Sequence, residues 1–479
     1  MTSMRSLRFL AAACLMLAGC NNGGDVTGGS INLSASGAVV YLADQNTVGV
    51  FELYLASSGT KLTPPLTPGG DVISFALTPD KTAVVYIADQ DTNDVFELYK
   101  VTIATPGVSV KLSGTLVSGG DVSSFAITPD GTSVVYLADQ QIDQVFDLYR
   151  VLFSNPASST LLNPALPSGR TVTQFAVTPD STRVVYIADQ TTDNVNELYQ
   201  VAFLNPPSDN TKLNSSLVAG GNVVNFAISP NSASVVYLAD QTIDQVFEIF
   251  LAAVTGPGSG TSLNPPLVAG QNVTTFAVTP DSTAVIYRAD EDTTGTFELY
   301  RVLFLSPQVS VVKLNGTLTA GGNVSSFSIA ANGSAVVYSA DQTILGVVEL
   351  FRTPLAPVGP AQKVNPTYVA GQNVTAFAIT PDSSAAIYMA NQTSAAVQLY
   401  QVSFSSLQVS SPPLNGALAS GGNVASFSIS PNSTLVLYLA DQTTFGTEEL
   451  YSVNVGAPGT SSKLNGPLVL GGNVTAFTF

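Results

Sequence analysis

The chain of 479 residues contains no histidine and no tryptophan, and its only cysteines are Cys14 and Cys20. Histidine is the side chain that most often performs acid–base catalysis near neutral pH. Without histidine, and without cysteine after residue 20, the chain cannot form a Ser-His-Asp triad, a zinc site of the usual kind or a thiol nucleophile. It also cannot form a disulfide framework, so packing must stabilise the body of the protein.

Positive charge is scarce as well. The sequence has 16 Lys and Arg against 33 Asp and Glu, which gives a net charge of −17 at pH 7, and the basic residues are scattered singly. Nucleic-acid binding needs clustered basic residues, so we expect no nucleic-acid partner. Paired carboxylates could still support glycoside chemistry. Nearly every carboxylate recurs at a repeated position, however, which predicts a structural role, and we therefore expect that the protein is not an enzyme.

The N-terminus has the pattern of an export signal. Arg5 and Arg8 precede a short apolar run, Phe9–Leu17, that is too short to span a bilayer. The following Leu17-Ala18-Gly19-Cys20 resembles the bacterial lipobox. An ordinary secretory signal is the alternative. The resemblance implies that residues 1–19 are a lipoprotein signal peptide and that Cys20 is lipidated, which would anchor the chain firmly to a membrane.

The residues after Cys20 give further information on the localisation of the protein. Asn21 stands where, in some bacteria, an Asp retains lipoproteins at the inner membrane, which favours the outer membrane, on its periplasmic side or at the surface. Residues 20–30 are small and polar and are expected to form the lipidated cysteine and a flexible tether. We therefore expect a lipid-anchored protein of the bacterial cell envelope.

Internal repetition organises the remaining chain, residues 31–479. An Ala-Asp-Gln string or a near variant recurs, and its acidic position falls at Asp44, Asp89, Asp139, Asp189, Asp240, Asp290, Asp341, Asn391 and Asp441. Successive spacings are 45, 50, 50, 51, 50, 51, 50 and 50 residues. Such a period is typical of propellers, solenoids and other repeat arrays, and it predicts nine units of about 50 residues.

Each unit is expected to contain four strands and no helix. In the third unit the β-branched and aromatic runs predict strands over 122–128, 134–138, 145–153 and 161–166. Pro129-Asp130-Gly131 predicts a tight turn between the first two strands, because proline presets φ and glycine accepts a positive φ. The fold class is therefore all-β.

The second strand of each unit indicates how the units are arranged. In Val134–Ala138 both faces are apolar, so the sheet must be covered on both sides. Identical sheets stacked around an axis cover one another, which predicts a single large β-propeller of about nine four-stranded blades. The chain ends in Gly471–Phe479, which is the first strand of a unit and nothing more. We expect this strand to complete the first blade, and an open solenoid capped by it is the alternative.

A known family shares this pattern. The segment Thr128–Gln140 resembles the WD40-like repeat of the TolB family, with its Pro-Asp-Gly turn and its strand ending in an aromatic residue. Glu97-Leu98-Tyr99 is similar to the family's third strand. The resemblance implies a propeller located in the cell envelope. Ala-Asp-Gln replaces the family's Ser-Asp-Arg, and a separate N-terminal domain is absent, so the partners of TolB itself cannot be assigned to this chain.

The acidic positions suggest a calcium hypothesis. Within a unit the turn Asp lies eight residues before a second acid, as in Asp89 with Glu97, and the eighth unit loses both charges together in Asn391 and Gln398. This joint loss indicates a shared environment. Two units also begin like a calcium-binding loop, and the candidate ligands are Asp89, Asp91, Asn93, Glu97, Asp290, Asp292 and Glu298, with Gly295 at the turn. Turn capping by Asp is the competing interpretation, and it is the one that we favour, so no metal or other cofactor is expected.

The function that the sequence favours is a non-catalytic scaffold that binds proteins or polymers of the cell envelope. The alternatives are a glycan-binding or carbohydrate-acting propeller with an acidic channel, and a surface protein stabilised by calcium. Residues that break the repeat are candidates for partner contacts, because the architecture does not require them. These residues are Arg170, Arg183, Arg288 and Asn196.

Overall fold

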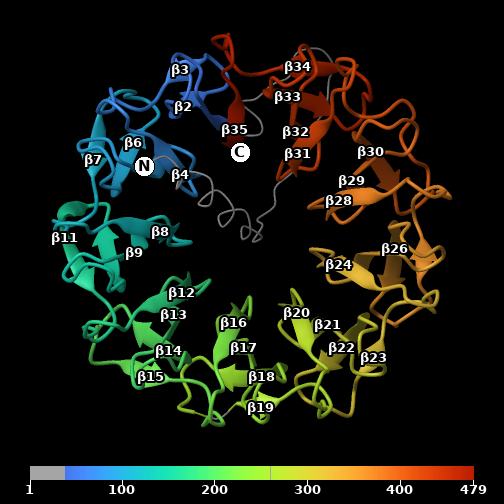
Figure 1. The fold of residues 1–479 in the computed structure, drawn as a ribbon, viewed down its shortest axis with the longest axis horizontal. Helices are drawn as coiled ribbons and strands as arrows, with labels where there is room; N and C mark the ends of the chain where they lie inside the picture. The colour runs from blue at the N-terminus through green and yellow to red at the C-terminus, as the bar shows by residue number, and fades with distance from the viewer. Residues whose placement is uncertain (1–37, 259) are drawn as a thin grey trace, which may run out of the picture.

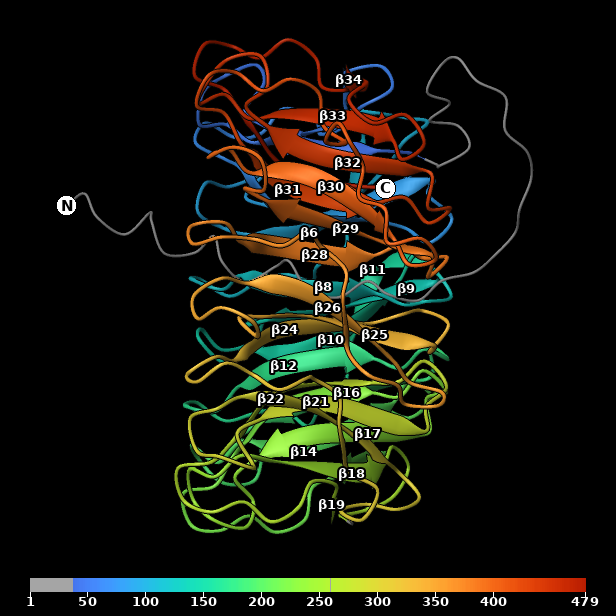
Figure 2. The same ribbon diagram turned by 90° about the vertical axis from the view of Figure 1, so that its right-hand side faces the viewer.

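The computed structural model describes residues 38–258 and 260–479. The predictions for the signal peptide, for Cys20 and for the tether lie outside these residues. All regular elements of the described chain are strands, and they form nine antiparallel sheets arranged in a ring (Figure 1). Seen from the side, the sheets lie one above the other like blades (Figure 2). The predicted all-β propeller with nine blades is confirmed.

Strands with the same position in a blade are equivalent. The inner strands, nearest the centre of the ring in Figure 1, are β4 (Val72–Leu77), β8 (Val122–Ile127), β12 (Val172–Val177), β16 (Val223–Ile228), β20 (Val273–Val278), β24 (Val324–Ile329), β28 (Val374–Ile379), β31 (Val424–Ile429) and β35 (Val474–Thr478). The second strands are β1 (Val40–Ala43), β5 (Ala83–Ala88), β9 (Ser133–Ala138), β13 (Arg183–Ala188), β17 (Ser234–Ala239), β21 (Ala284–Ala289), β25 (Ala335–Ala340), β29 (Ala385–Ala390) and β32 (Leu435–Ala440).

The third strands are β2 (Glu52–Leu55), β6 (Glu97–Thr102), β10 (Asp147–Leu152), β14 (Glu197–Ala202), β18 (Glu248–Ala253), β22 (Glu298–Leu303), β26 (Glu349–Pro354), β30 (Gln398–Ser403) and β33 (Glu449–Asn454). The outer strands are β3 (Thr60–Lys61), β7 (Ser109–Lys111), β11 (Asn155–Leu161), β15 (Asn210–Lys212), β19 (Thr261–Ser262), β23 (Val312–Lys313), β27 (Gln362–Lys363) and β34 (Ser461–Lys463). We number the blades 1 to 9 from β1.

The apolar faces of neighbouring blades pack against one another. All six residues of β9 are buried, as the apolar sequence of this strand predicts. One hydrophobic cluster joins Val135 and Leu148 of blade 3 to Tyr186 and Tyr199 of blade 4. Equivalent clusters join the other neighbouring blades. Burial of apolar surface between blades is therefore the main force that holds the ring together.

The two ends of the described chain meet in blade 1. The inner strand of this blade is β35, which pairs with β1 in antiparallel register from Val40 opposite Thr478 to Ala43 opposite Val474. Blade 1 therefore has four strands in the order β3-β2-β1-β35. The predicted closure by Gly471–Phe479 is confirmed, and the open solenoid is excluded.

The Pro-Asp turns define one face of the ring. In blade 3 the Thr128 hydroxyl and the Thr132 backbone N–H both donate to the carboxylate of Asp130. Gly131 has φ +68°, and Ser181 holds the same conformation in blade 4 at φ +59°. The Asp130 backbone N–H donates to the Ser181 hydroxyl at 3.0 Å, so each turn contacts the next around the ring. We call this side, with the turns and the loops between third and outer strands, the turn face.

The opposite side we call the loop face. It carries the loops between second and third strands, such as 139–146, and the connections that lead from one blade into the next, such as 112–121. The described chain begins at Ala38, immediately before β1, and β1 runs from the turn face to the loop face.

Two details of the strand prediction are wrong. The outer strand of blade 3 is Asn155–Leu161, earlier than the predicted 161–166. Residues 162–166 instead form a buried connection, in which the side chain of Asn163 accepts the Leu148 backbone N–H at 2.7 Å. Blade 8 has three strands, because its fourth position is reduced to a single bridge between Val402 and Val409.

Candidate functional site

The repeated Asp of each unit is a structural residue. Asp89 is 2% exposed, and its two oxygens accept the backbone N–H groups of Asp71 at 2.5 Å and Asp94 at 2.9 Å. A carboxylate that accepts two N–H groups satisfies donors which burial would otherwise leave unpaired. The same pattern holds for Asp290, which accepts from Asn272 and Gly295. In blade 8 Asn391 retains only the first of these bonds.

The second repeated acid pairs with a lysine. Lys61, Lys111, Lys212, Lys313, Lys363 and Lys463 at the ends of outer strands form ion pairs with Glu52, Glu97, Glu197, Glu298, Glu349 and Glu449 of the neighbouring third strands. Tyr99 also donates its hydroxyl to Glu97 at 2.8 Å. These buried glutamates are therefore neutralised within their own blades.

The two acids of a unit share an environment, as their joint loss in blade 8 indicates. Burial raises the pKa of Tyr149, and the charges of Asp147 and Asp139 raise it further. Both carboxylates therefore act on the same phenol, although each has its own hydrogen-bond partners. The tyrosine rings stack in pairs, one from the second and one from the third strand, and Tyr136 lies 5.5 Å from Tyr149.

The calcium candidates lie near one another but contact protein donors. In blade 6 the amine of Lys313 lies 2.7 Å from Asp292 and 2.7 Å from Glu298, so a cation of the protein itself occupies this position. In blade 2 Asp91 accepts from Gln90 at 3.4 Å, and Asn93 donates to Asp94 at 2.7 Å.

Within residues 38–258 and 260–479, no group of three or more His, Cys, Asp or Glu side chains has the geometry of a metal site. Calcium binding stays an untested alternative, and the geometry favours the structural interpretation of these acids.

The residues that break the repeat have structural partners. Arg170 donates to the carbonyl of Gln190 at 2.7 Å, and Arg183 donates to Gln200 at 2.6 Å. The Asn196 backbone N–H donates to Asn222 at 2.9 Å. Arg288 lies over the ring of Phe297 at 4.2 Å and donates to the Val324 carbonyl in the next blade. The expectation that the architecture does not use these side chains is therefore wrong for the three arginines.

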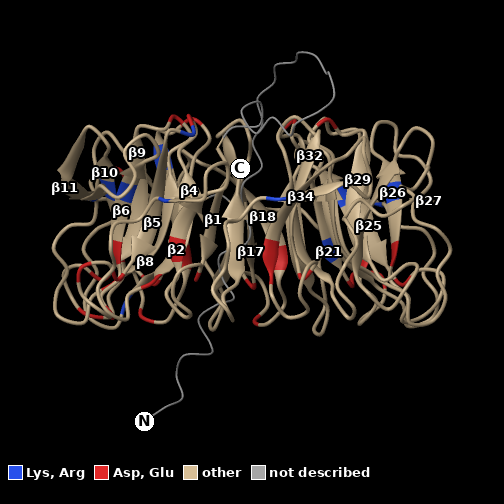
Figure 3. Ribbon diagram, turned by 90° about the horizontal axis from the view of Figure 1, so that it is seen from above, with Lys and Arg blue, Asp and Glu red and all other residues tan. Residues whose placement is uncertain are grey.

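The inner strands are neutral. None of the nine contains Asp, Glu, Lys or Arg, and hydroxyl, amide and small side chains alternate with apolar ones, as in the Val-Thr-Gln-Phe-Ala-Val sequence of β12. Acidic residues occur instead along both rims of the ring (Figure 3). These strands therefore do not supply the acidic channel that the glycan hypothesis assumed.

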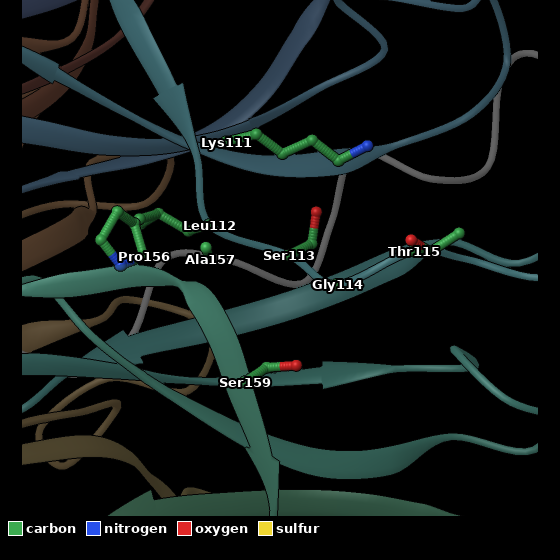
Figure 4. A pocket seen from close by; sticks show the side chains of 8 residues that line it. All are labelled: Lys111, Leu112, Ser113, Gly114, Thr115, Pro156, Ala157 and Ser159. Carbon is green, nitrogen blue, oxygen red and sulfur yellow. The ribbon is translucent and has the colours of Figure 1, made fainter.

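A cavity of about 310 Å³ opens between the outer parts of blades 2 and 3. Figure 4 shows its lining, with Lys111, Ser113 and Thr115 on one side and Pro156 and Ser159 on the other. Lys111 is already paired with Glu97, so the cavity presents hydroxyl groups and no free charge.

A second cavity, of about 470 Å³, lies at the loop face where blade 9 meets blade 1. We call it the seam cavity, and its lining comprises Asn423, Ala425, Asp441, Gly446, Glu448, Asn473 and Thr475. Burial raises the pKa of Glu448, and the charge of Asp441 adds to this effect.

Sequence reasoning missed Glu448, although a signal was present. The equivalent residues of the other units are Phe51, Phe96, Phe146, Asn196, Phe247, Phe297, Val348 and Val397. A carboxylate at a position that is otherwise mainly aromatic or aliphatic breaks the repeat as clearly as an isolated arginine does. The Glu-Glu pair at 448–449 hides this change, because Glu449 is the expected acid of the third strand.

Comparisons with known proteins show the fold alone. No protein-family model and no curated protein matches the chain. Among solved structures, a eukaryotic initiation factor is similar over 92% of this chain and 97% of its own, with 12% identity and a TM-score of 0.54. A prolyl endopeptidase matches 78% of this chain and 55% of its own, with 13% identity and a TM-score of 0.47.

An oligogalacturonate lyase from Vibrio parahaemolyticus matches 88% of this chain and 97% of its own, with 12% identity and a TM-score of 0.44. The likeness to the initiation factor shows a shared fold alone, and at these identities the activities of none of the three proteins transfer to this chain. Among the described residues no helix has the length and apolar character needed to cross a membrane.

Proposed function

We propose that the protein is a non-catalytic, lipid-anchored scaffold of the bacterial cell envelope, with a TolB-like propeller that binds proteins or polymers. One observation carries this proposal. The recurring polar side chains form hydrogen bonds and ion pairs within and between blades, whereas exposed loop positions, such as the one four residues after the repeated Asp, differ chemically from blade to blade. Rigid frameworks with variable loops are the usual form of recognition modules.

The anchor rests on the lipobox resemblance at residues 17–20. Replacement of Cys20 by Ser should prevent lipidation and release the protein from the membrane fraction into the soluble envelope fraction. Labelling with a radioactive or clickable fatty acid checks this directly. Labelling of the serine variant, or unchanged membrane association, would contradict the anchor.

The scaffold function is tested by affinity capture of its binding partners. The full-length protein, immobilised in detergent, is incubated with the solubilised envelope of its source bacterium and separately with purified peptidoglycan and envelope polysaccharide. Recovery of discrete proteins or of one polymer is the expected result. Recovery of neither would contradict a scaffold, and turnover of a polysaccharide would favour an enzyme.

Glycan binding is the second candidate. The neutral amide and hydroxyl side chains of the inner strands favour it, for example Gln174, which donates to Asn225 of the next blade at 3.2 Å. Sugars are commonly held by such groups. Retention on polysaccharide that is lost in a Gln174→Ala variant would support this alternative.

A further inference from the structure

The seam, where blade 9 meets blade 1, carries a carboxylate at a position that is mainly apolar in the other blades. Glu448 lies there in place of an aromatic residue, and its backbone N–H donates to the side chain of Asn473 at 2.8 Å. The carboxylate of Glu448 has no hydrogen-bond or ion-pair partner among the described residues. Every glutamate at the start of a third strand, by contrast, has one.

The other groups in the seam cavity are already engaged. Asp441 accepts the backbone N–H groups of Asn423 and Gly446. The side-chain oxygens of Asn423 and Asn473 accept the backbone N–H groups of Val397 and Glu448. One free carboxylate is too few ligands for calcium, which takes six to eight oxygens, but it suits a single ammonium or guanidinium group.

Exposed apolar side chains lie in the loops that lead to the residues of the seam cavity. The exposed fractions are 66% for Phe445, 101% for Leu470 and 57% for Val48. Phe445 lies over Gly421, where φ is +84° and a Cβ atom would come within 3.3 Å of the ring. Val48 of blade 1 lies beside Gly471, where φ is +89° and a Cβ atom would come within 3.8 Å of its side chain. Exposed apolar side chains in loops next to an unpaired charge are typical of a protein-binding surface.

The same loop position is acidic elsewhere on the ring. Counting four residues from the repeated Asp, blades 1 to 9 carry Val48, Asn93, Asp143, Asp193, Asp244, Thr294, Leu345, Ala395 and Phe445. Blades 3 to 5 thus present exposed carboxylates, and blades 7, 9 and 1 present exposed apolar side chains. The backbone is equivalent in all blades, so the fold does not require acidic residues in some blades and apolar residues in others at this position.

The positive charge of the loop face is already paired, because the six lysines at the ends of the outer strands form ion pairs with glutamates of the third strands. The loops between second and third strands contain no Lys or Arg, and the connections between blades contain only Arg170, which donates to the Gln190 carbonyl. A basic partner is therefore attracted to this face, while acidic polysaccharide and anionic lipid are repelled. The described chain also begins on the opposite face, at Ala38, so an anchored molecule can leave the loop face accessible.

From these observations we propose that the seam between blades 9 and 1 binds a protein through one Lys or Arg side chain, which enters the seam cavity to meet Glu448 while flanking apolar residues pack on Phe445, Leu470 and Val48. This rests on the proposed scaffold function and names the surface and the chemistry of the partner. The acidic loops of blades 3 to 5 attract basic surface elsewhere on the same partner.

Two substitutions remove the carboxylate at low risk to folding. Glu448→Gln keeps its shape, and Glu448→Phe restores the residue found in five other blades. The matched control is Glu291→Gln, which removes a half-buried carboxylate from the same face and restores the Gln of most other blades. A photo-crosslinking residue is placed at Leu470, and its control replaces Leu204, which is 86% exposed on the turn face.

The experiment uses the full-length protein in the detergent-solubilised envelope of its source bacterium. We expect a protein crosslinked from position 470 and not from position 204. Its yield should fall about tenfold with either substitution of Glu448 and stay unchanged with Glu291→Gln, since loss of a partly buried charge pair costs roughly that factor or more. Melting temperatures of the Glu448 variants equal to that of the parent, and a melting temperature of Glu291→Gln no lower than that of the parent, exclude misfolding as the cause.

Failure of the seam site and failure of the scaffold function would give different results. A protein that is captured but crosslinks equally from position 204, or is insensitive to Glu448, overturns the seam site and leaves the scaffold function standing. Recovery of a polysaccharide alone overturns the protein partner and favours glycan binding. Capture of nothing overturns both proposals.

Discussion

The backbone N–H of Asn473 donates to the carboxylate of Asp44 at 2.5 Å, across 429 residues of sequence. The same bond links Asp121 to Asp139 within blade 3, where the two residues are only 18 apart. The ring is therefore closed by the bond that organises every blade, and the closing blade pairs the first strand of the described chain with the last.

Removal of residues 471–479 should destabilise the whole ring. It deletes β35, exposes the edge of β1 and uncovers the apolar face of blade 1, which should lower the melting temperature and cause aggregation. Thermal unfolding and light scattering measure both effects. A soluble truncated chain with an unchanged melting temperature would contradict ring closure.

Asp44 can be tested separately. Asp44→Ala leaves the N–H groups of Asn473 and Gly49 without their acceptor, at a cost of about 1–3 kcal/mol in total, because Gly49 is exposed to solvent. Asp44→Asn should cost much less, because Asn391 holds the equivalent position in blade 8 and still accepts one N–H. Urea unfolding gives both values. An equal loss of unfolding free energy in the two variants would show that these hydrogen bonds do not stabilise the ring.

The stacked tyrosines of blade 3 provide a matched pair. The Tyr136 hydroxyl accepts the backbone N–H of Gly114 in blade 2 and donates to Gln140, whereas the buried hydroxyl of Tyr149 has no partner in the described structure. Tyr136→Phe should therefore destabilise the protein by about 1–2 kcal/mol. Tyr149→Phe should be neutral or stabilising, as Phe250 and Phe351 at that position suggest. The reverse order in urea unfolding would refute this assignment.

Glu291 should make the protein less stable at alkaline pH. Burial raises the pKa of Glu291 to about 7, and the charge of Asp292 adds to this effect. The folded carboxyl therefore holds a proton that the unfolded chain releases above its ordinary pKa, so stability falls as pH rises toward 7. Glu291→Gln should be more stable than the parent at pH 8 by on the order of 2 kcal/mol and similar to it near pH 4. An equal difference at both pH values would contradict the shift.

The Asp carboxylates of the Pro-Asp turns should make the protein less stable at acid pH. Hydrogen bonds from Thr78 and Thr82 hold the pKa of Asp80 below its usual range. The unfolded chain then binds protons more readily, so this stabilisation is present above about pH 4 and is lost as pH falls. Asp80→Asn should weaken the dependence of the urea midpoint between about pH 5 and 3. Asn231 shows that Asn fits this turn, since it accepts the Ser229 hydroxyl at 2.7 Å.

The sequence was sufficient to predict the repeated framework, because that framework depends on local signals. Apolar second strands such as Val134–Ala138, Pro-Asp turns and the unmatched strand at 471–479 are all visible in the sequence of a unit, and the structure confirms the elements that they predict. The outer strand of blade 3 was misplaced because Leu161–Leu166 has the composition of a strand. In fact Leu162 and Leu166 belong to the connection that leads to the next blade, and their side chains are buried there.

Other features depend on contacts between blades, which a single unit does not reveal. The bond from Asp130 to Ser181 spans 51 residues, and the seam cavity combines residues of blade 9 with Asn473 and Thr475 of blade 1. Glu448 could have been noticed by aligning the nine units. That its carboxylate faces a cavity, rather than solvent or a lysine, follows only from the ring.

Hydrogen–deuterium exchange of residues 474–478 tests the closed ring most directly. In a closed ring these backbone amides pair with β1 and should be protected to the same degree as the inner strands of the other blades, such as Val122–Ile127. Exchange as fast as that of the exposed loops would show that β35 is not part of blade 1 and would contradict the nine-bladed closed propeller.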